Sequence, residues 1–331
     1  MRRPTQIAFP GIVASAVLVS ALVTSSLSGC ASGNSSVRPS VTTSHTAVPP
    51  ATRTPTPSQT PPPPIDQDGV AAALTALERE YDATIGLVAI DTATGATVTH
   101  NGDRRFGYAS SIKVFAAAQF LRTVRGDARD EVVHWTADDV AAAGYSPVTS
   151  EHVGDGLSYA QLAEAAVRMS DNTALNLVLT RIGGPTGLDA ALAELGDTTT
   201  EVVHGEPDLN TIEPGSTEDT TTPAAFTSAL ATVLDGTTLS AADTALLGGW
   251  MSGNATGDAL IRAGAPDGWV VADKSGGAGP IRNDVARVTR PDGDTIVLSV
   301  LTRRNDPTQA YDDALVARSA AAVLRAFDTG G

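Results

Sequence analysis

Cysteine is almost absent from this chain of 331 residues, in which Cys30 is the only one. An intramolecular disulfide is therefore excluded, and the fold depends on its hydrophobic core alone. The hydrophobic fraction of 42% is sufficient for such a core. With one cysteine and five dispersed histidines the sequence has no cluster of metal ligands, so we expect neither a metal nor another cofactor.

Acidic residues are absent before Asp66, although Arg2, Arg3, Arg38 and Arg53 precede it. Of the 22 basic side chains in the whole chain, 18 therefore follow residue 64, together with all 37 acidic ones. The net charge of this part is 18 less 37, or −19. A surface of this charge repels nucleic acid and anionic lipid, so we expect no nucleic-acid partner.

The first 29 residues have the features of a signal peptide. Arg2 and Arg3 form a charged start, and the apolar stretch 12–23 is too short to span a bilayer. The sequence Leu27-Ser28-Gly29-Cys30 resembles the lipobox of bacterial lipoproteins, in which the cysteine becomes the lipidated first residue. An ordinary secretory signal with an incidental thiol is the alternative. The lipobox predicts an exported protein, lipid-anchored through Cys30 at the outer face of the cytoplasmic membrane.

Residues 30–64 are rich in proline, serine and threonine and end in four consecutive prolines. They contain too few apolar residues for a core, which predicts a semi-extended tether after the lipidated cysteine. At ~3.1 Å per residue in polyproline II, this tether would reach up to roughly 100 Å from the membrane. A folded domain is then expected in residues 65–331.

Hydrophobic periodicity and turn signals predict strands at both ends of this domain and helices between them. The helical part is expected at roughly residues 112–255. This order predicts an α+β fold in which an antiparallel sheet carries a helical insertion. Helices are predicted at 69–81, 162–169, 173–182, after Thr222-Pro223 and at 309–327, and strands at 85–90, 269–273, 284–289 and 295–301.

Lysine is also rare, because only Lys113 and Lys274 occur among the 22 basic residues. Lys113 ends the sequence Ser110-Ser111-Ile112-Lys113, which precedes the apolar run 114–121. Ser110 is therefore expected at or near a helix N-terminus, where free N–H groups stabilise an oxyanion. A residue three positions on shares the helix face, so the Lys113 amine can reach the Ser110 hydroxyl. Serine needs a neighbouring base to act as a nucleophile, and no histidine here lies in a Ser/His pattern.

Three further motifs follow along the chain. Ser170-Asp171-Asn172 lies at the turn between two predicted helices, and Glu206-Pro207-Asp208-Leu209-Asn210 lies in a stretch without regular periodicity. Lys274-Ser275-Gly276-Gly277 is expected at the end of an edge strand, where small residues let a substrate approach the backbone. Each motif alone is compatible with a cap or a turn, but their order and spacing together indicate one site.

The motifs S-x-x-K, S-D-N and K-[ST]-G in this order resemble the signature of class A β-lactamases and penicillin-binding proteins. The region from about residue 66 to 327 is similar to a class A β-lactamase. The resemblance implies a five-stranded antiparallel sheet packed with helices beside an all-helical subdomain, with the site in the cleft between them. It also implies hydrolysis of β-lactam antibiotics, and hence resistance to them. We expect a monomer whose partners are small-molecule β-lactams and the membrane.

The resemblance implies a catalytic role for five side chains. Ser110 would attack the lactam carbonyl, and either Lys113, or Glu206 through a water, would remove its proton. Ser170, held by Lys274, would relay a proton to the lactam nitrogen. Glu206 would then activate the water that hydrolyses the acyl-enzyme.

Other residues would bind the substrate or support these groups. The backbone N–H groups of Ser110 and Gly277 would form the oxyanion hole. Asn172 would bind the amide side chain of the substrate, and Tyr145 would form a wall of the cleft. The remaining expected site residues are Lys274, Ser275, Gly276 and Arg282 for the substrate carboxylate, Asn210 for the hydrolytic water, and Asn176, His204 and Asp219 as supports.

Three features of the sequence depart from the pattern of the family. Gly277 lacks the side chain that relatives usually carry there, and only eight positions separate Lys274 from Arg282. The loop that contains Glu206 is usually closed by an arginine paired with an aspartate, but here those places hold His204 and Asp219. We therefore predict that His204 forms the tie to Asp219.

Two other functions remain compatible with the sequence. A D,D-peptidase, or penicillin-binding protein, shares three of the motifs but lacks a deacylating carboxylate such as Glu206. A non-hydrolytic β-lactam-binding lipoprotein would be expected to have lost some of the catalytic side chains. Steady turnover of a β-lactam distinguishes the predicted enzyme from both.

Overall fold

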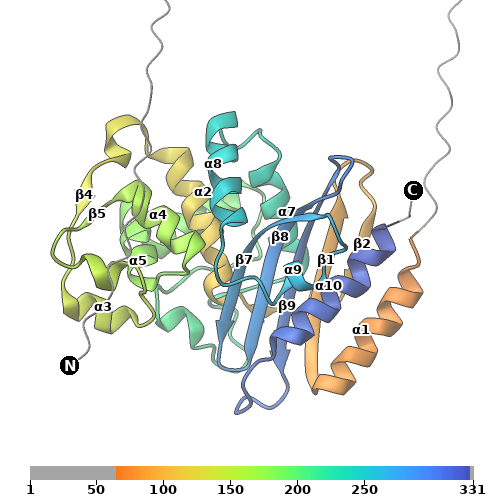
Figure 1. The fold of residues 1–331 in the computed structure, drawn as a ribbon. Coiled ribbons are helices and arrows are strands. Elements are labelled where there is room, and N and C mark those ends of the chain that lie inside the picture. The colour runs from red at the N-terminus through yellow and green to blue at the C-terminus, as the bar shows by residue number, and fades with distance from the viewer. Residues whose placement is uncertain (1–64, 329–331) are drawn as a thin grey trace, which may run out of the picture. The chain divides into compact units, whose positions relative to one another are not determined.

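The computed structural model describes residues 65–328, so the predicted signal peptide, Cys30 and the tether lie outside the described residues. A five-stranded antiparallel sheet in the order β2-β1-β9-β8-β7 forms the centre of this part (Figure 1). The predicted α+β class with such a sheet is therefore confirmed. The strands are β1 (Ala83–Asp91), β2 (Thr97–His100), β7 (Val270–Ala278), β8 (Ile281–Thr289) and β9 (Thr295–Arg304).

The central strands of the sheet are buried on both faces. Residues 296–302 of β9 and 83–89 of β1 are buried without alternation. Such continuous apolar runs arise where both faces of a sheet are covered. Helices therefore pack on each side.

One face of the sheet is covered by α1 (Gln67–Tyr81), α10 (Asp313–Phe327) and the short α9 (Ile261–Gly264). The side chains of α1 that pack on the sheet, Val70, Leu74 and Leu77, recur at helical spacing and are buried. Figure 1 shows α1 and α10 side by side on this face.

The other face packs against a helical layer built around α2 (Lys113–Thr123). Eight of the eleven residues of α2 are buried, so this helix has almost no solvent-facing side. It therefore holds the residues that precede it, including Ser110, rigidly inside the domain. The surrounding helices are α3 (Ala137–Ala143), α4 (Tyr159–Arg168), α5 (Asn172–Arg181), α6 (Gly184–Glu194), α7 (Pro223–Leu234) and α8 (Ala241–Ser252).

Short elements connect these layers. The pair β3 (Phe106–Gly107) and β6 (Thr220–Thr221) joins the segment before Ser110 to the end of the loop that contains Glu206. A second pair, β4 (Val132–Val133) with β5 (Leu157–Ser158), closes the helical layer. Single 3₁₀ turns are η1 (Ala109–Ile112), η2 (Gly126–Arg129), η3 (Thr149–His152) and η4 (Asp208–Asn210).

Two boundaries differ clearly from the prediction. Strand β7 continues to Ala278 instead of stopping at residue 273, because its small residues pair with β8 as far as Ile281. Helix α10 begins at Asp313, not residue 309, because Asp312 is its cap and accepts a hydrogen bond from Ala314 N. The separate helical subdomain at residues 112–255 stays a prediction.

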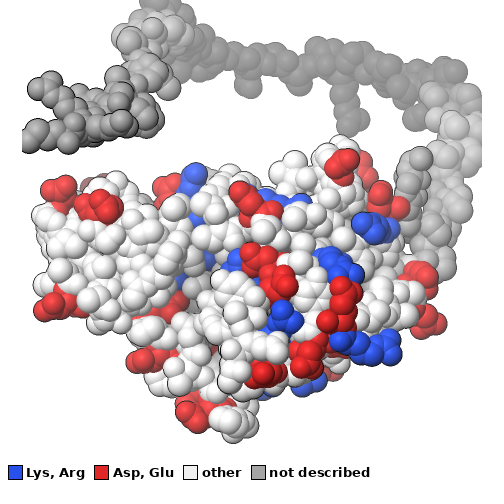
Figure 2. Space-filling model, turned by 60° about the horizontal axis from the view of Figure 1, so that its bottom comes forward, with Lys and Arg blue, Asp and Glu red and all other residues white. Residues whose placement is uncertain are grey.

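The surface of the described part carries the excess of acidic side chains expected from the sequence. Figure 2 shows acidic groups spread over one face, with basic ones among them, and not gathered in a single patch. Within residues 65–328, none of the helices combines the length and the apolar character needed to cross a bilayer.

Candidate active site

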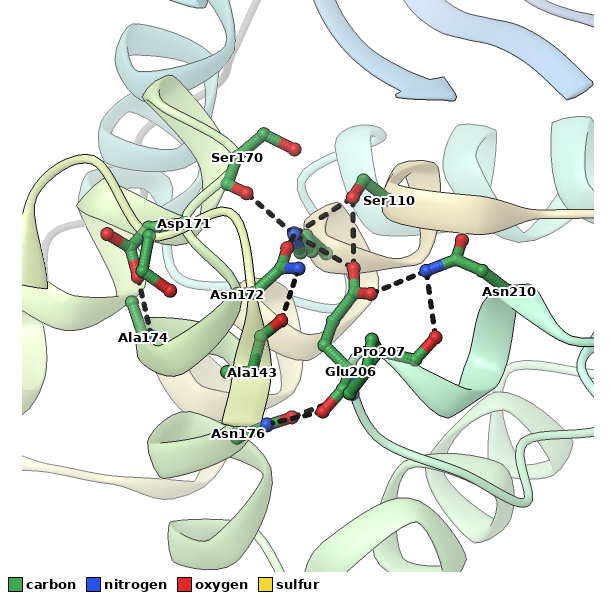
Figure 3. A network of polar contacts seen from close by, with 12 residues as sticks. Ser110, Ala143, Ser170, Asp171, Asn172, Ala174, Asn176, Glu206, Pro207 and Asn210 are labelled. Atoms are coloured by element: carbon green, nitrogen blue, oxygen red, sulfur yellow. Dashed lines mark hydrogen bonds and ion pairs between the residues drawn. The ribbon is translucent and has the colours of Figure 1, made fainter. Parts of the chain in front are cut away.

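Ser110 lies in η1, which leads directly into α2. Ala109 before it has a left-handed φ of 46°, which turns the chain sharply before the helix. The Ser110 hydroxyl contacts two groups: it accepts from Lys113 Nζ at 2.9 Å and donates to Glu206 Oε1 at 3.0 Å (Figure 3). The hydroxyl therefore lies between two groups that can accept its proton.

Lys113 is fully buried, and its amine contacts four polar groups. Besides Ser110, its amine reaches Ser170 O at 2.7 Å, Asn172 Oδ1 at 2.6 Å and Glu206 Oε1 at 3.0 Å. Burial lowers the pKa of Lys113 from its ordinary value, and the Glu206 carboxylate opposes this shift. Because burial prevails, the neutral amine is more accessible here than on a surface lysine.

Glu206 is fixed by two asparagines. Asn176 binds its backbone on both sides, since Glu206 N donates to Asn176 Oδ1 at 2.9 Å and Asn176 Nδ2 donates to Glu206 O at 2.8 Å. Asn210 Nδ2 donates to Glu206 Oε2 at 2.6 Å. One carboxylate oxygen thus faces Ser110 and Lys113 while the other is held by Asn210 (Figure 3).

The turn between α4 and α5 presents Ser170 and Asn172 to the site. Asp171 caps α5 by accepting from Ala174 N at 2.9 Å, and its other oxygen accepts from Thr149 N at 2.9 Å. Ser170 has a left-handed φ of 57°, a strained conformation that these contacts of Asp171 support. Asn172 donates to Ala143 O at 2.8 Å, which leaves its oxygen for Lys113.

Lys274 belongs to edge strand β7 and faces Ser170. Its amine donates to Ser170 Oγ at 3.1 Å and to Ser275 O at 2.6 Å, and it is fully buried. Burial, with the positive charge of Lys113 nearby, lowers the pKa of Lys274 to about 7. The charge of this lysine therefore depends on pH near neutrality.

Edge strand β7 lies directly against the nucleophile segment. A Cβ on Gly276 would stand 2.8 Å from Ser111 N and 2.9 Å from Tyr108 O, so only glycine fits. Asn283 of β8 fixes the same segment, because its Nδ2 donates to Tyr108 O at 3.1 Å. This close packing brings Gly277, the expected second oxyanion donor, to the wall of the same cleft as Ser110.

These residues surround a cleft of about 460 Å³. Lys113 and Lys274 lie buried behind its walls. Asn176 supports Glu206 from outside it. The lining residues are Ser110, Tyr145, Ser170, Asn172, Glu206, Asn210, Thr256, Ser275, Gly276, Gly277, Arg282 and Tyr311.

Arg282 reaches the cleft despite its short spacing from Lys274. It is held by Asp313, whose Oδ1 accepts from Arg282 Nε at 2.7 Å, and its guanidinium lies 4.7 Å from the ring centroid of Tyr311. Tyr311 and Thr256 were not among the predicted site residues. Thr256 Oγ1 lies 2.5 Å from Ser275 Oγ. Neither Tyr311 nor Thr256 belongs to a short motif that would have identified it.

The predicted contact between His204 and Asp219 is present. His204 Nδ1 lies 2.5 Å from Asp219 Oδ2, and this hydrogen bond raises the pKa of His204 above its ordinary value. The two residues lie at the base of the loop that carries Glu206. The loop is therefore closed by a pair whose charge can titrate.

With this geometry established, comparison with known proteins gives the family. The model of the family described as "Beta-lactamase enzyme family" matches residues 69–327. The chain belongs to this family. The predicted resemblance to class A β-lactamases is thereby confirmed.

Individual members of the family are similar along most of their length. Beta-lactamase 3 of Bacillus cereus is 43% identical over 253 residues, which is 76% of this chain and 79% of the relative. A β-lactamase of Amycolatopsis lactamdurans is 42% identical, covering 82% and 89%. The crystal structure of a class A β-lactamase from Clostridium kluyveri matches with a TM-score of 0.75 at 39% identity, covering 78% of this chain and 98% of that one.

Proposed function

We propose that this enzyme hydrolyses β-lactam antibiotics through an acyl-enzyme on Ser110. The observation that supports the proposal best is the double contact of Ser110 Oγ with Lys113 Nζ and Glu206 Oε1, at 2.9 and 3.0 Å. Ser110 attacks the lactam carbonyl while its proton passes to Lys113 or to Glu206. The C–N bond of the lactam breaks, and its nitrogen takes a proton from Ser170, which contacts Lys274.

Deacylation is the step that separates a hydrolase from a protein that only becomes acylated. Glu206 is oriented by Asn176 and Asn210 with one oxygen directed at Ser110. A carboxylate in this place accepts a proton from a water that attacks the ester carbonyl, which then releases Ser110. The oxyanion of both steps is stabilised by the backbone N–H groups of Ser110 and Gly277.

The cleft also supports a binding mode for the substrate. Asn172 donates to the amide side chain, beside the exposed ring of Tyr145. At the other end, the basic groups Lys274 and Arg282, with Ser275, bind the carboxylate that β-lactams share. Guanidinium and ammonium groups are suited to such an anion.

Turnover of a chromogenic cephalosporin tests the proposal against its two alternatives. The parent enzyme is expected to consume many equivalents at a steady rate, whereas Ser110→Ala releases no product. One equivalent of product followed by arrest would instead indicate a long-lived acyl-enzyme. Cleavage of a D-Ala-D-Ala peptide by such a protein would identify a D,D-peptidase, and no cleavage a non-hydrolytic receptor.

We further propose that the enzyme is exported and is anchored to the membrane through lipid on Cys30. The support lies in the sequence: a charged and apolar leader, the lipobox at Leu27–Cys30 and a proline-rich tether. This places hydrolysis outside the cytoplasmic membrane, between the antibiotic and its targets.

A further inference from the structure

Asp219 lies at the base of the loop that carries Glu206 and binds more than its partner His204. It is almost fully buried, with 1% exposure. Its Oδ1 accepts from Val203 N and His204 N at 3.1 Å each, and from Tyr108 Oη at 2.6 Å. Of these donors to Asp219, Tyr108 is the one that lies outside the Glu206 loop.

Tyr108 belongs to the nucleophile segment, two residues before Ser110. Its carbonyl oxygen accepts from Ser111 N at 3.2 Å and from Asn283 Nδ2 at 3.1 Å, so its backbone is fixed to η1 and to β8. Its ring is fully buried and stacks on Phe226 of α7, with centroids 6.3 Å apart and planes 5° from parallel. The hydroxyl is therefore a rigid extension of the segment that holds the nucleophile.

We propose that Tyr108 is a positioning residue that links the nucleophile segment to the Glu206 loop through Asp219, and so sets the distance between Ser110 and Glu206 for deacylation. This inference rests on the proposed function and deepens it. Acylation depends less on the link, because Lys113 contacts Ser110 from within α2 and this contact does not involve the Glu206 loop.

The two side-chain donors to Asp219 respond differently to pH. Burial and the negative charges of Asp219, Glu206 and Asp189 raise the pKa of Tyr108 well above its ordinary value, so its hydroxyl stays protonated and donates throughout the working range.

His204 is 43% exposed and titrates. Its hydrogen bond to Asp219, with the charges of Glu218 and Asp208 nearby, raises its pKa, but the proton is still lost as the pH rises. A neutral imidazole gives a weaker hydrogen bond to a carboxylate than an imidazolium does. At alkaline pH, Tyr108 is therefore the side-chain donor whose hydrogen bond to Asp219 keeps its strength.

The test compares acylation and deacylation in Tyr108→Phe at pH 5.5 and 8.5, with a penicillin as the probe. The substitution keeps the ring that stacks on Phe226, and a melting curve verifies the fold. Acylation, measured as adduct formation by rapid quench and mass spectrometry, is expected to change by less than about threefold. Adduct decay at pH 8.5 is expected to slow by about tenfold, and at pH 5.5, where His204 is charged, by less than about threefold.

Two further variants make the result specific. Tyr159→Phe removes the hydroxyl of a half-buried tyrosine on α4 and is expected to leave both steps unchanged. Adding His204→Arg to Tyr108→Phe supplies a permanent charge and is expected to restore decay at pH 8.5. Rescue of decay without a change in acylation distinguishes the link from a general gain in stability, which would affect both steps.

Equal slowing of acylation and deacylation at both pH values, or no slowing of either, would overturn the proposed link. Failure of His204→Arg to restore decay would also contradict it. If the parent enzyme itself formed no adduct at Ser110, the proposed function would fail first. The two failures are thus distinguishable by the parent alone.

Discussion

The two lysines of the chain are both fully buried, but they have different neighbours. Lys113 faces the Glu206 carboxylate at 3.0 Å, which favours its charged form. The amine of Lys274 donates to a hydroxyl and a carbonyl, and its pKa is lowered to about 7. A lysine proposed to bind the substrate carboxylate therefore loses its charge as the pH rises through neutrality.

This difference predicts the alkaline limb of the pH profile. Since kcat/KM reports the ionisation of the free enzyme, it should fall as the pH rises above about 7 in the parent. Lys274→Arg keeps its charge at any working pH, so its alkaline limb should move up by at least about one pH unit. The measurement is kcat/KM for a penicillin from pH 5.5 to 9.5. Identical alkaline limbs in both proteins would rule out Lys274 as the titrating group.

The adjacent glycines Gly276 and Gly277 should tolerate substitution differently. A Cβ at Gly276 would meet backbone atoms of the nucleophile segment at 2.8 to 3.2 Å, whereas at Gly277 its nearest neighbour, at 2.9 Å, is the terminal Nη1 of Arg282. Gly276→Ala should lower kcat/KM by at least about 100-fold, since overpacking displaces β7 from Ser110. Gly277→Ala should lose less than about tenfold. Similar losses in both variants would contradict this account.

Among the elements, the loop that carries Glu206 is closed at its base by the contact between His204 and Asp219. The folded state raises the pKa of His204, so its contribution to stability is complete below the unfolded value of about 6.5 and is lost as the pH rises through the folded value. An arginine at position 204 would stay charged and would keep its contribution to stability at both pH values. His204→Arg should therefore raise the melting temperature by about 1–3 °C at pH 8 and by less than about 1 °C at pH 5.5.

A matched substitution tests whether this gain is specific to the tie. The side chain of His134 is exposed and has no hydrogen-bond partner within residues 65–328. His134→Arg should give no pH-dependent gain. If His204→Arg shifts the melting temperature equally at both pH values, or at neither, the histidine does not act as a titrating tie.

Much of the fold was predictable because its elements have strong local signals. Helix α4 begins at a capping box whose residues can be read from the sequence, in which Ser158 accepts from Gln161 N. Gly183 ends α5 with a left-handed φ of 97°. The sequence did not reveal α6, because glycine followed by Pro185 is also typical of a helix stop, although proline fits the first turn of a new helix as well.

In the candidate site, too, residues with a local sequence signal were predicted and residues without one were not. Residues in short motifs, such as Ser110, Ser170 and Glu206, were predicted from the order of those motifs and from the resemblance to a known family. Tyr108 and Tyr311 were not, because their importance depends on contacts with residues 111 positions away or with a neighbouring strand. Long-range pairing of this kind leaves no periodic signal in the sequence.

For the whole molecule, the account predicts an acidic catalytic domain connected by a tether to a lipid-anchored cysteine. Cys30→Ser should move the enzyme from the membrane fraction to the soluble fraction, or leave it as an unprocessed precursor. The tether variant Ser36→Ala should stay in the membrane fraction. Fractionation with a β-lactamase assay measures both. An unchanged membrane fraction in Cys30→Ser would remove the support for the anchor.

The second step of the proposed reaction separates a hydrolase from a protein that only becomes acylated. Glu206→Gln keeps the size of the side chain and its contact with Asn210 but removes the carboxylate that would activate water. The exposed Glu213→Gln, in the same loop, is the matched control.

The most direct test is the intact mass of Glu206→Gln after mixing with a penicillin. The account predicts an adduct of one penicillin on Ser110 that decays about 10²–10⁴-fold more slowly than in the parent, while Glu213→Gln shows no persistent adduct. An adduct on Glu206→Gln that decays at the parental rate would contradict the assignment of deacylation to Glu206.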